Sequence, residues 1–459
     1  MTNSDTGRQS AIEAAQTRVD DGQFARDLAA LVACPSESQV PEGAPHLRAY
    51  LEDLMAPRFA AAGFATEIHD GTDMPPVLVA RRIEDLAKPT VLVYGHGDVV
   101  HGQGDAWSDG LSPFELTQRG DRLYGRGSAD NKVQHLINLS AAEAVIAARG
   151  QLGFNLTFLI EMGEETGSPG LDAFCAEHRE ELAADVLIAS DGPRLRPEVP
   201  TIFLGARGAV NFDLVVDLRE GAHHSGNWGG LLADPAILLT HAIASITDAR
   251  GAIRVPEWRP NSLTGDVRAM LARLPDPGQG GPGISPDWGE PGLSPAERAY
   301  GWNSFAVLAM TSGRPDAPMN AISGTARATC QLRHVVGTDA DDILPALRRH
   351  LETEGFGMVE VRTWEKGTFP ATRTDPDGAW AKTVAASIAQ TTGAPPDILP
   401  NLAGSLPNHV FSETLALPTV WVPHSYGGCN QHAPDEHVLV PLCRDALGVM
   451  TGLFWDIGA

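Results

Sequence analysis

The sequence of 459 residues predicts an α/β fold with a mostly parallel central sheet. Three short apolar runs, at residues 89–94, 156–160 and 186–189, have the length and composition of buried strands. Histidine or acidic side chains follow each run within a few positions. Because open α/β sheets assemble their sites from the carboxyl ends of strands, this repetition favours the fold class and marks those ends as candidate functional positions.

The first run leads into Gly95-His96-Gly97-Asp98. His96 and Asp98 are two residues apart, so in an extended chain their side chains face the same side. Neutral imidazole binds a metal ion through one nitrogen, and a carboxylate can accept the N–H of the other. His96 is therefore a candidate ligand and Asp98 its partner. Taken alone, the segment is explained equally well by polar groups that cap the sheet.

A helical pattern covers residues 133–149 and is preceded by Gly125-Arg126-Gly127 and Asp130. The apolar face of this helix is expected to contain Val133, Leu136, Ile137, Ala144 and Ala147. A phosphate loop is excluded, because the G-x-G-x-x-G pattern would need glycine where Asp130 stands. An acid at a helix start is usually a cap, but a carboxylate that bridges two cations fits the same position.

The second run is followed by the adjacent acids Glu164 and Glu165. Neighbouring carboxylates at the end of an apolar strand repel each other unless a cation or a shared proton relieves them. One acid could bind metal while the other takes a proton from water and returns it to a leaving amine. Two solvated loop acids are the alternative.

The remaining candidates are Asp191, just after the third run, and His432, at the end of a glycine-rich loop. Each is uninformative alone. Together the segments supply two imidazoles and several carboxylates beside glycines, which is what a hydrolytic site with two bound metal ions requires. We therefore interpret the chain as a metal-dependent amide hydrolase.

The order and local sequence of these segments resemble a family of two-zinc amidohydrolases and exopeptidases. The family includes acetylornithine deacetylase, succinyl-diaminopimelate desuccinylase, carboxypeptidase G, aminoacylase and carnosinase-type dipeptidases, and the resemblance runs from about residue 20 to the C-terminus. Asp191 in place of Glu, together with Asp130-Asn131-Lys132, looks more like the dipeptidase branch than the deacetylase branch.

The resemblance implies a role for each candidate in the metal site. The implied metal ligands are His96 and Asp191 for one ion, Glu165 and His432 for the other, and Asp130 as a bridge between them. Glu164 is the implied general base, and Asp98 orients His96. Two divalent ions are expected, with zinc as the first choice and manganese or cobalt as alternatives.

The resemblance also implies two domains. A three-layer catalytic domain is expected at residues 1–203 and 372–459, interrupted by a smaller α+β lid and dimerisation domain at 204–371. Residues 207–218 of this insertion alternate as a half-buried strand does. His224, or its neighbour His223, resembles the histidine that reaches the reacting carbonyl, in dimeric members from the other subunit, where it would stabilise oxyanion charge.

Four further residues are substrate-binding candidates by the same resemblance, namely Asn320, Arg333, Gly404 and Ser405. A guanidinium can bind both oxygens of a free carboxylate, which suits Arg333. Asn320 and Arg333 could equally be exposed strand residues. Residues 401–403 read Asn-Leu-Ala where many relatives carry Arg and Gly, which leaves the substrate class open.

The stretch from Gly251 to Trp302 holds four large aromatic residues around a Pro/Gly-rich centre at 275–295. This composition favours an irregular loop. It could line the substrate cleft, although tryptophans are more often ordinary packing residues.

The amino-acid composition limits the classes of molecule that the protein is expected to bind. A formal net charge of −24 argues against nucleic acid or anionic membrane, because both need basic patches. Five cysteines without a C-x-x-C pair are expected to be reduced thiols, and a polar N-terminus without an apolar signal core predicts a cytoplasmic protein.

The sequence as a whole predicts hydrolysis of an amide or peptide bond in a small-molecule substrate by a water that two metal ions activate, with Glu164 as general base. A dipeptidase or related exopeptidase, acting as a homodimer, is the leading hypothesis. The alternatives are an N-acyl amino acid amidohydrolase or a specialised metabolite amidase or deaminase. A noncatalytic binding protein is disfavoured by the presence of both Glu164 and Glu165.

Overall fold

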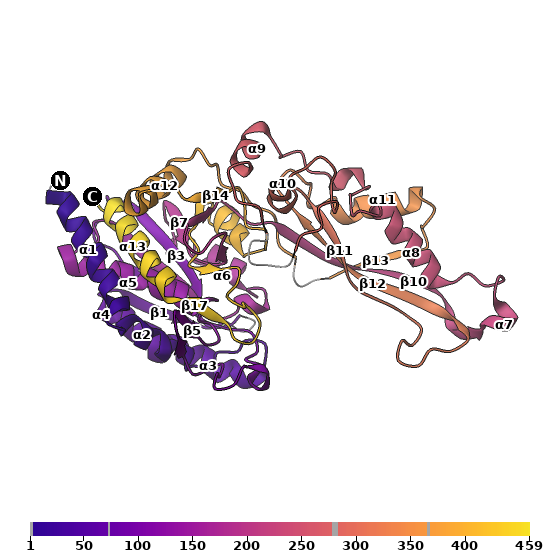
Figure 1. The fold of residues 1–459 in the computed structure, drawn as a ribbon, viewed down its shortest axis with the longest axis horizontal. Coiled ribbons are helices and arrows are strands. Elements are labelled where there is room, and N and C mark those ends of the chain that lie inside the picture. The colour runs from indigo at the N-terminus through magenta and orange to yellow at the C-terminus, as the bar shows by residue number, and fades with distance from the viewer. Residues whose placement is uncertain (1–2, 72–73, 278–282, 365–367) are drawn as a thin grey trace.

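The structure, a computed structural model, describes residues 3–71, 74–277, 283–364 and 368–459. It has a larger part that contains both chain ends and a smaller, elongated part that finishes at helix α7 (Ser225–Trp228) (Figure 1). The N- and C-terminal helices lie side by side, and Arg8 forms an ion pair with Asp456. None of the described helices is long and apolar enough to cross a membrane.

The larger part is built on a mixed sheet of eight strands. In order across the sheet these are β1 (Ala65–His69), β2 (Val77–Arg82), β6 (Asn155–Glu161), β3 (Thr90–His96), β7 (Val186–Ala189), β15 (Thr419–Trp421), β9 (Thr201–Phe203) and β14 (Asp397–Leu399). The central strands β6, β3, β7 and β15 run parallel, whereas the β1–β2, β2–β6 and β15–β9 pairings are antiparallel. The three runs predicted as strands are therefore parallel neighbours, and their carboxyl ends meet at one edge.

Helices cover both faces of this sheet and complete the three predicted layers. On one face lie α1 (Asn3–Asp20), α2 (Gln23–Val32), α5 (Lys132–Arg149), α12 (Ala379–Thr392) and α13 (Val440–Ile457). The other face is covered by α6 (Leu171–Glu177) and the helical turn η6 (Val410–Thr414). Shorter helices are α3 (Ala44–Ala49), α4 (Ala56–Ala61), α9 (Gly265–Leu271) and α10 (Pro295–Tyr300).

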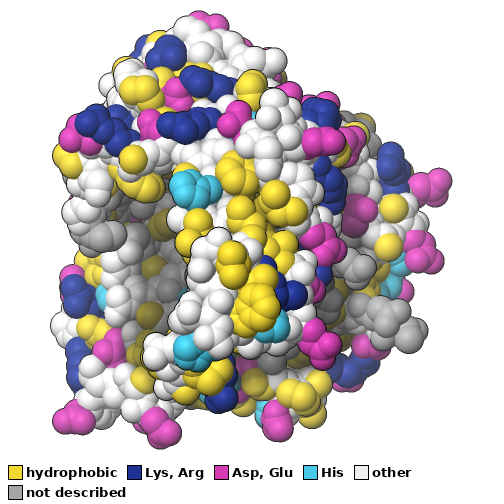
Figure 2. All heavy atoms as spheres, turned by 90° about the vertical axis from the view of Figure 1, so that its right-hand side faces the viewer, with side chains coloured by type: hydrophobic (Ala, Val, Ile, Leu, Met, Phe, Trp, Pro, Cys, Tyr) yellow, Lys and Arg dark blue, Asp and Glu magenta, His cyan; other side chains and the backbone are white. Residues whose placement is uncertain are grey.

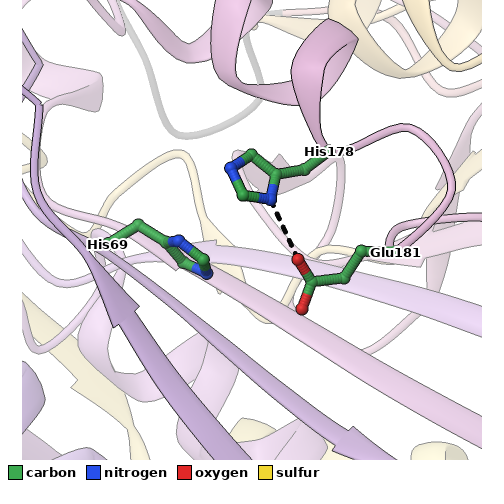
Figure 3. Close-up of side chains that lie close together, drawn as sticks. All are labelled: His69, His178 and Glu181. Atoms are coloured by element: carbon green, nitrogen blue, oxygen red, sulfur yellow. Dashed lines mark hydrogen bonds and ion pairs between the residues drawn. The ribbon is translucent and has the colours of Figure 1, made fainter.

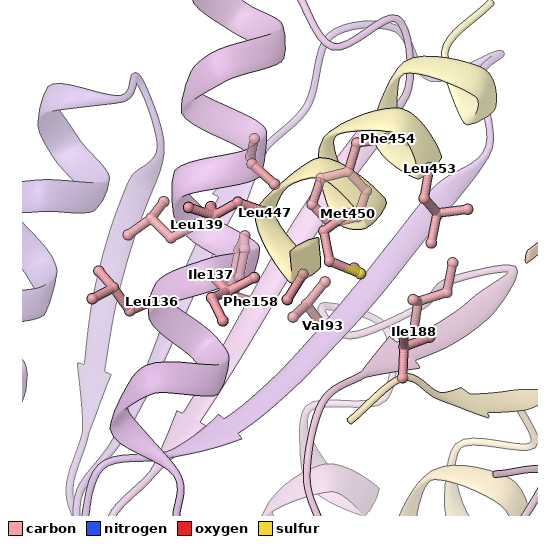
Figure 4. Packing of buried hydrophobic residues seen from close by; sticks show 14 of the residues in the cluster. Val93, Leu136, Ile137, Leu139, Phe158, Ile188, Leu447, Met450, Leu453 and Phe454 are labelled. Atoms are coloured by element: carbon pink, nitrogen blue, oxygen red, sulfur yellow. The ribbon is translucent and has the colours of Figure 1, made fainter. Parts of the chain in front are cut away.

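Helices α5 and α13 form the main core with the central strands (Figure 4). Leu136 and Ile137 of α5 share one buried cluster with Val93 and Phe158 of the sheet and with Met450 of α13. Helix α5 begins one residue before the predicted start. The prediction was wrong for Ala147, which is exposed because the last turn of α5 extends past the edge of the core.

The smaller part is an α+β domain, as predicted. Its antiparallel sheet has the order β11 (Ser304–Ser312), β12 (Ala321–His334), β10 (Gly208–His224) and β13 (Glu360–Thr363). Helices α8 (Pro235–Ile246) and α11 (Ile343–Thr353) pack on it around a core of their own that includes Phe212 and Trp258. The strand expected at 207–218 is β10, which is longer and, over its first half, more completely buried than the alternation suggested. The residues at which the two domains change, 203/204 and 371/372, stay a prediction.

Two small ladders position the loops around the sheet edge. Strand β5 (Arg122–Tyr124) pairs with β4 (Thr117–Arg119) and with β17 (His437–Leu439), and β8 (Pro193–Arg194) pairs with β16 (Ser425–Tyr426). Because β5 ends just before Gly125 and β17 begins just after Glu436, their pairing brings the loop that contains Asp130 beside the loop that contains His432.

The aromatic-rich stretch is only partly irregular. Residues 272–277 and 283–294 contain neither helix nor strand, and residues 278–282 of the predicted loop lie outside the described part of the chain. Trp258 is fully buried and donates its indole N–H to the carbonyl of Ile343, so it is a packing residue of the smaller domain. All five cysteines are free thiols.

Candidate metal centre

The predicted metal-site residues converge at the carboxyl ends of the central strands. His96 is the last residue of β3, Asp191 follows β7, and Glu164 and Glu165 open the helical turn η4 (Glu164–Thr166) that follows β6. Asp130 precedes α5 in the loop held by β5, and His432 comes from the loop between β16 and β17. The structure therefore brings together side chains from five separate segments.

Close packing explains the two glycines that flank His96. A Cβ atom on Gly95 would lie 2.7 Å from the Cβ of His135, and one on Gly97 would overlap the ring of Tyr50. Helix α5 and the Tyr50 segment can therefore approach the end of β3 only where side chains are absent. The approach buries His96 completely.

Asp130 lies at the centre of the cluster, with one carboxylate oxygen on each side. Its Oδ1 is 3.1 Å from Nε2 of His96, which also lies 3.6 Å from Oδ2 of Asp191. Its Oδ2 is 3.0 Å from Nε2 of His432, which lies 3.1 Å from Oε2 of Glu165. The result is two histidine–carboxylate pairs on opposite sides of a shared carboxylate.

Burial and mutual repulsion make the outer carboxylates difficult to ionise. Burial, reinforced by the charge of Asp130, raises the pKa of Glu165 to about 7 and that of Asp191 to about 6. Burial also raises the pKa of Glu164 well above its usual range. Asp130 itself is buried, but hydrogen bonds from His432 and His96 hold its pKa below the usual range.

The pKa values of the two histidines are also raised, which for an imidazole favours the charged form. Hydrogen bonds to Asp130 and Glu165 raise the pKa of His432 to about 11. Burial alone would lower the pKa of His96, but hydrogen bonds to Asp130 and Asp98 hold it well above its usual range. The carboxylates beside each ring therefore favour the protonated form of both imidazoles.

Divalent cations fit this donor set. Among the described residues, Oδ2 of Asp191 is buried without a hydrogen-bond partner. Ligand atoms of His96, Asp130 and Glu165 all lie within 4.8 Å of one another. Imidazole nitrogens and carboxylate oxygens are suitable ligands for zinc, and a bound cation would relieve the repulsion among these acids.

Asp98 lies beside His96, where the sequence predicted it. Its Oδ1 is 3.3 Å from Nδ1 of His96, and the backbone carbonyl of Asp98 is 3.1 Å from the same nitrogen. Its carboxylate also accepts the backbone N–H groups of Glu164 and Glu165, at 3.2 and 3.1 Å, and the hydroxyl of Ser38 at 2.6 Å. The side chain thus contacts both the His96 and the Glu165 sides of the cluster.

A cavity of about 280 Å³ opens beside the cluster. Its lining includes Asp130, Glu164, Asp191, Gly404, Ser405 and His432. Arg333, at the end of β12, donates from Nη1 to Oγ of Ser405 at 2.8 Å. Three of the four substrate-binding candidates therefore lie in or against the cavity wall.

His224 and Asn320 lie elsewhere. His224 ends β10 beside α7, at the outer end of the smaller domain (Figure 1). The carbonyl of Asn320 accepts the backbone N–H of Ser225 at 2.8 Å, so both residues belong to this distant end. Nδ1 of His224 accepts the N–H of Gly226, and the neighbouring His223 ring contacts Trp228. A single chain does not bring either histidine to the acid cluster.

None of the described residues of the aromatic stretch lines the cavity beside Asp130. Trp288 and Trp302 instead line a second cavity of about 450 Å³, together with Arg207 and Phe305 of the smaller domain. The cleft-lining role considered for this stretch has no support from their positions.

Sequence reasoning missed Glu436, which organises the Asp130 loop. This buried carboxylate forms an ion pair with Arg126 at 2.7 Å and accepts the backbone N–H groups of Gly127, Ala129 and Asp130. Arg126 and Glu436 are separated by 310 positions, so no local pattern connects them. The only available signal was that Glu436 follows the His432 loop closely.

Several known proteins with similar sequences are named as dipeptidases. The chain is 33% identical over 250 residues to the Beta-Ala-His dipeptidase of Mus musculus, a match that covers 51% of this chain and 50% of the mouse protein. The chain thus spans about half the length of that relative. It is 27% identical over 364 residues to the cysteinylglycine-S-conjugate dipeptidase of Corynebacterium striatum, which covers 76% of this chain and 77% of the other.

Solved structures show the same fold. An M20 family metallo-carboxypeptidase from Sulfolobus solfataricus has a TM-score of 0.79 at 24% identity, covering 95% of this chain and 99% of the other. Human carnosine dipeptidase 1 has a TM-score of 0.77 at 22% identity, covering 98% and 99%. The sequence model of peptidase family M20/M25/M40 matches residues 92–456 of this chain. This range includes all of the clustered residues. With this match over most of its length, the chain belongs to peptidase family M20/M25/M40.

Proposed function

We propose that this protein is a metal-dependent dipeptidase or related exopeptidase that hydrolyses a small peptide or amide. The observation that carries the proposal is the position of Asp130, whose two oxygens face two separate histidine–carboxylate pairs. Hydrolytic sites with two metal ions need such a shared ligand, because the ions must act together on one water and one carbonyl.

The ligand assignment follows from the pairs. His96 and Asp191 would hold one ion, Glu165 and His432 the other, and Asp130 both. When bound, the ions would supply Lewis-acid chemistry that polarises the substrate carbonyl and makes water acidic enough to react near neutral pH. Zinc is the first candidate, with manganese and cobalt as alternatives, because all three accept imidazole and carboxylate ligands.

Glu164 is the proposed proton carrier. It lines the cavity, and its backbone is fixed by Asp98, so its carboxylate is held beside the cluster without a place in either histidine–carboxylate pair. A carboxylate oxygen of Glu164 would take the proton of the attacking water and return it to the nitrogen of the leaving amine. The pKa that burial raises above the usual range suits a group that must both accept and donate a proton.

Arg333 is the proposed anchor for a free substrate carboxylate. Its guanidinium donates to Ser405 in the cavity wall and to Oε1 of Gln331, and both of these partners are neutral. A planar cation held in this way can bind both oxygens of a peptide C-terminus. Gly404 and Ser405 would form the wall beside the peptide.

We also propose a homodimer, in which the outer end of one smaller domain supplies His224 and Asn320 to the cavity of the other chain. Strand β11 is an edge strand with exposed apolar side chains, including Val307, Leu308 and Met310, and an edge of this kind favours pairing with another copy. Figure 2 looks at the molecule from the α7 end and shows hydrophobic side chains gathered down the middle of that face.

The test of function is a matched substrate panel. Enzyme reconstituted with zinc, manganese or cobalt would be assayed on dipeptides with a free α-amine and on their N-acyl amino acid counterparts, with a chelator-treated control. Faster hydrolysis of the free-amine dipeptides would support the dipeptidase assignment. Faster hydrolysis of the acylated compounds would move the protein to the amidohydrolase branch, and metal-independent activity would refute the site assignment.

A further inference from the structure

A second cluster of metal-ligating side chains lies apart from the Asp130 site. It consists of His69 at the end of β1, His178 directly after α6, and Glu181 in the following turn (Figure 3). Strand β1 is at the edge of the large sheet, separated from β3 by β2 and β6. The cluster therefore shares no residue and no strand with the candidate metal centre.

The three side chains are arranged around a common point. Nδ1 of His178 lies 2.9 Å from Oε2 of Glu181, and the centroids of the two imidazole rings are 4.6 Å apart. One ligand atom from each of the three residues lies within 4.8 Å of the others. Figure 3 shows both rings turned toward the carboxylate.

Two buried atoms of this cluster, Nε2 of His69 and Oε1 of Glu181, have no hydrogen-bond partner among the described residues, and only Oε1 has an ion-pair partner, Arg81. Leaving a buried imidazole nitrogen unpaired is unfavourable unless something binds it. Nε2 of His69 therefore indicates a ligand that the protein alone does not supply.

The surroundings fix the donors in place. The ring of Phe174 stacks on that of His178 at 4.3 Å and meets the edge of His69 at 5.1 Å. Nη2 of Arg81 lies 3.2 Å from Oε1 of Glu181, which leaves Oε2 facing the histidines. Partners that hold ligands in this way are typical of metal sites, although the positive charge of Arg81 also lowers the affinity for a cation.

We propose that His69, His178 and Glu181 form a further zinc site. Two imidazole nitrogens and one carboxylate oxygen are a common protein set for zinc, with water in the remaining position. The 2.9 Å between Nδ1 and Oε2 is close to the separation of about 3.3 Å that two ligands have across a tetrahedral zinc ion. A bound ion would tie the edge strand β1 to the end of α6.

The number of zinc ions per chain tests the site. Metal-free wild type, His69→Gln and Glu181→Gln would be dialysed against buffered zinc and analysed by mass spectrometry, with the exposed His241→Gln as the matched control. Each cluster variant should bind one zinc ion fewer than wild type, while His241→Gln binds the same number. Hydrolytic activity should be retained, because no cluster residue lines the cavity at Asp130.

This test does not depend on the proposed function. It measures the difference in zinc content between wild type and the cluster variants, and that difference is one ion whatever number of ions the Asp130 cluster binds. Equal zinc content in wild type and both cluster variants would overturn the proposal. Should the variants fold poorly by circular dichroism, wild-type crystals soaked in zinc decide the matter. An anomalous-scattering peak between His69, His178 and Glu181 supports the site, and its absence at saturating zinc refutes it.

Discussion

Asp98 links the two sides of the candidate metal centre through one buried carboxylate. It faces Nδ1 of His96 and accepts the backbone N–H groups of both Glu164 and Glu165. The end of β3 and the turn after β6 are therefore held in one arrangement by a group that is not itself in the cavity lining. Hydrogen bonds to the side of a metal ligand that faces away from the metal commonly fix its orientation. Asp98 is therefore expected to hold His96 and the Glu164–Glu165 turn in a constant position relative to each other.

Glu164 can be separated from the metal ligands by substitution. Replacing it with glutamine removes the proton acceptor but keeps the size of the side chain, so kcat should fall by about 10²- to 10⁴-fold. Metal content should be unchanged, because neither histidine–carboxylate pair includes Glu164. Steady-state kinetics and elemental analysis measure the two quantities, with the exposed Glu42→Gln as control. Wild-type turnover in Glu164→Gln would refute its role as general base.

The shifted pKa values predict that zinc binds more tightly as the pH rises. Without a cation, the pKa is about 7 for Glu165, about 6 for Asp191 and about 11 for His432. Binding requires these groups to lose their protons, so it must release protons and weaken as pH falls. Calorimetric titration of metal-free protein at pH 5.5 and pH 8 in two buffers of different ionisation enthalpy gives the affinity and the protons released. An affinity that is independent of pH would contradict the assigned ligands.

At the level of elements, the loop before α5 depends on Glu436. This acid and Arg126 are each only 1% exposed, and Glu436 also accepts three backbone N–H groups. Removing one partner of a buried ion pair leaves the other charge uncompensated, so Glu436→Gln should lower the free energy of unfolding by about 3 kcal/mol. Urea titration of the metal-free protein measures this free energy of unfolding without a contribution from metal binding. The exposed Asp377, paired with Lys382, supplies the control Asp377→Asn, which should unfold like wild type.

Local pattern was sufficient for the elements that carry the ligands. Strands β3, β6 and β7 were predictable because each is an almost unbroken apolar run, as strands buried on both faces must be. The repeated acids and histidines at their ends then indicated a shared edge. Pairings across long separations were not predictable, because the Arg126–Glu436 pair and the approach of His69 to His178 and Glu181 each join segments that are far apart in the chain.

The distance of His224 and Asn320 from the cavity could not be predicted from the sequence, because it depends on how the two domains are arranged in the whole molecule. His224 and Asn320 carry motif resemblance but lie at the outer end of the smaller domain, away from the cavity. A dimer would give both residues a site to act on and would cover the edge strand β11. Leu308→Asp should therefore shift the protein toward monomer in sedimentation equilibrium, whereas Leu86→Asp, at an exposed position on the larger part, should not. A monomeric wild type would contradict the dimer.

Mixing two inactive variants tests whether His224 acts across the dimer. Neither Glu164→Gln nor His224→Ala should be active alone. In a mixed dimer, the cavity of the His224→Ala chain keeps its own Glu164 and receives His224 from the other chain, so one of the two cavities is complete. If the chains exchange freely, about half of the dimers are mixed and about a quarter of wild-type activity should return. The control is the double variant mixed with Glu164→Gln, which leaves every cavity without a functional Glu164 and should remain inactive. No recovery from a mixture shown by mass spectrometry to contain mixed dimers would mean that His224 does not act on the other chain.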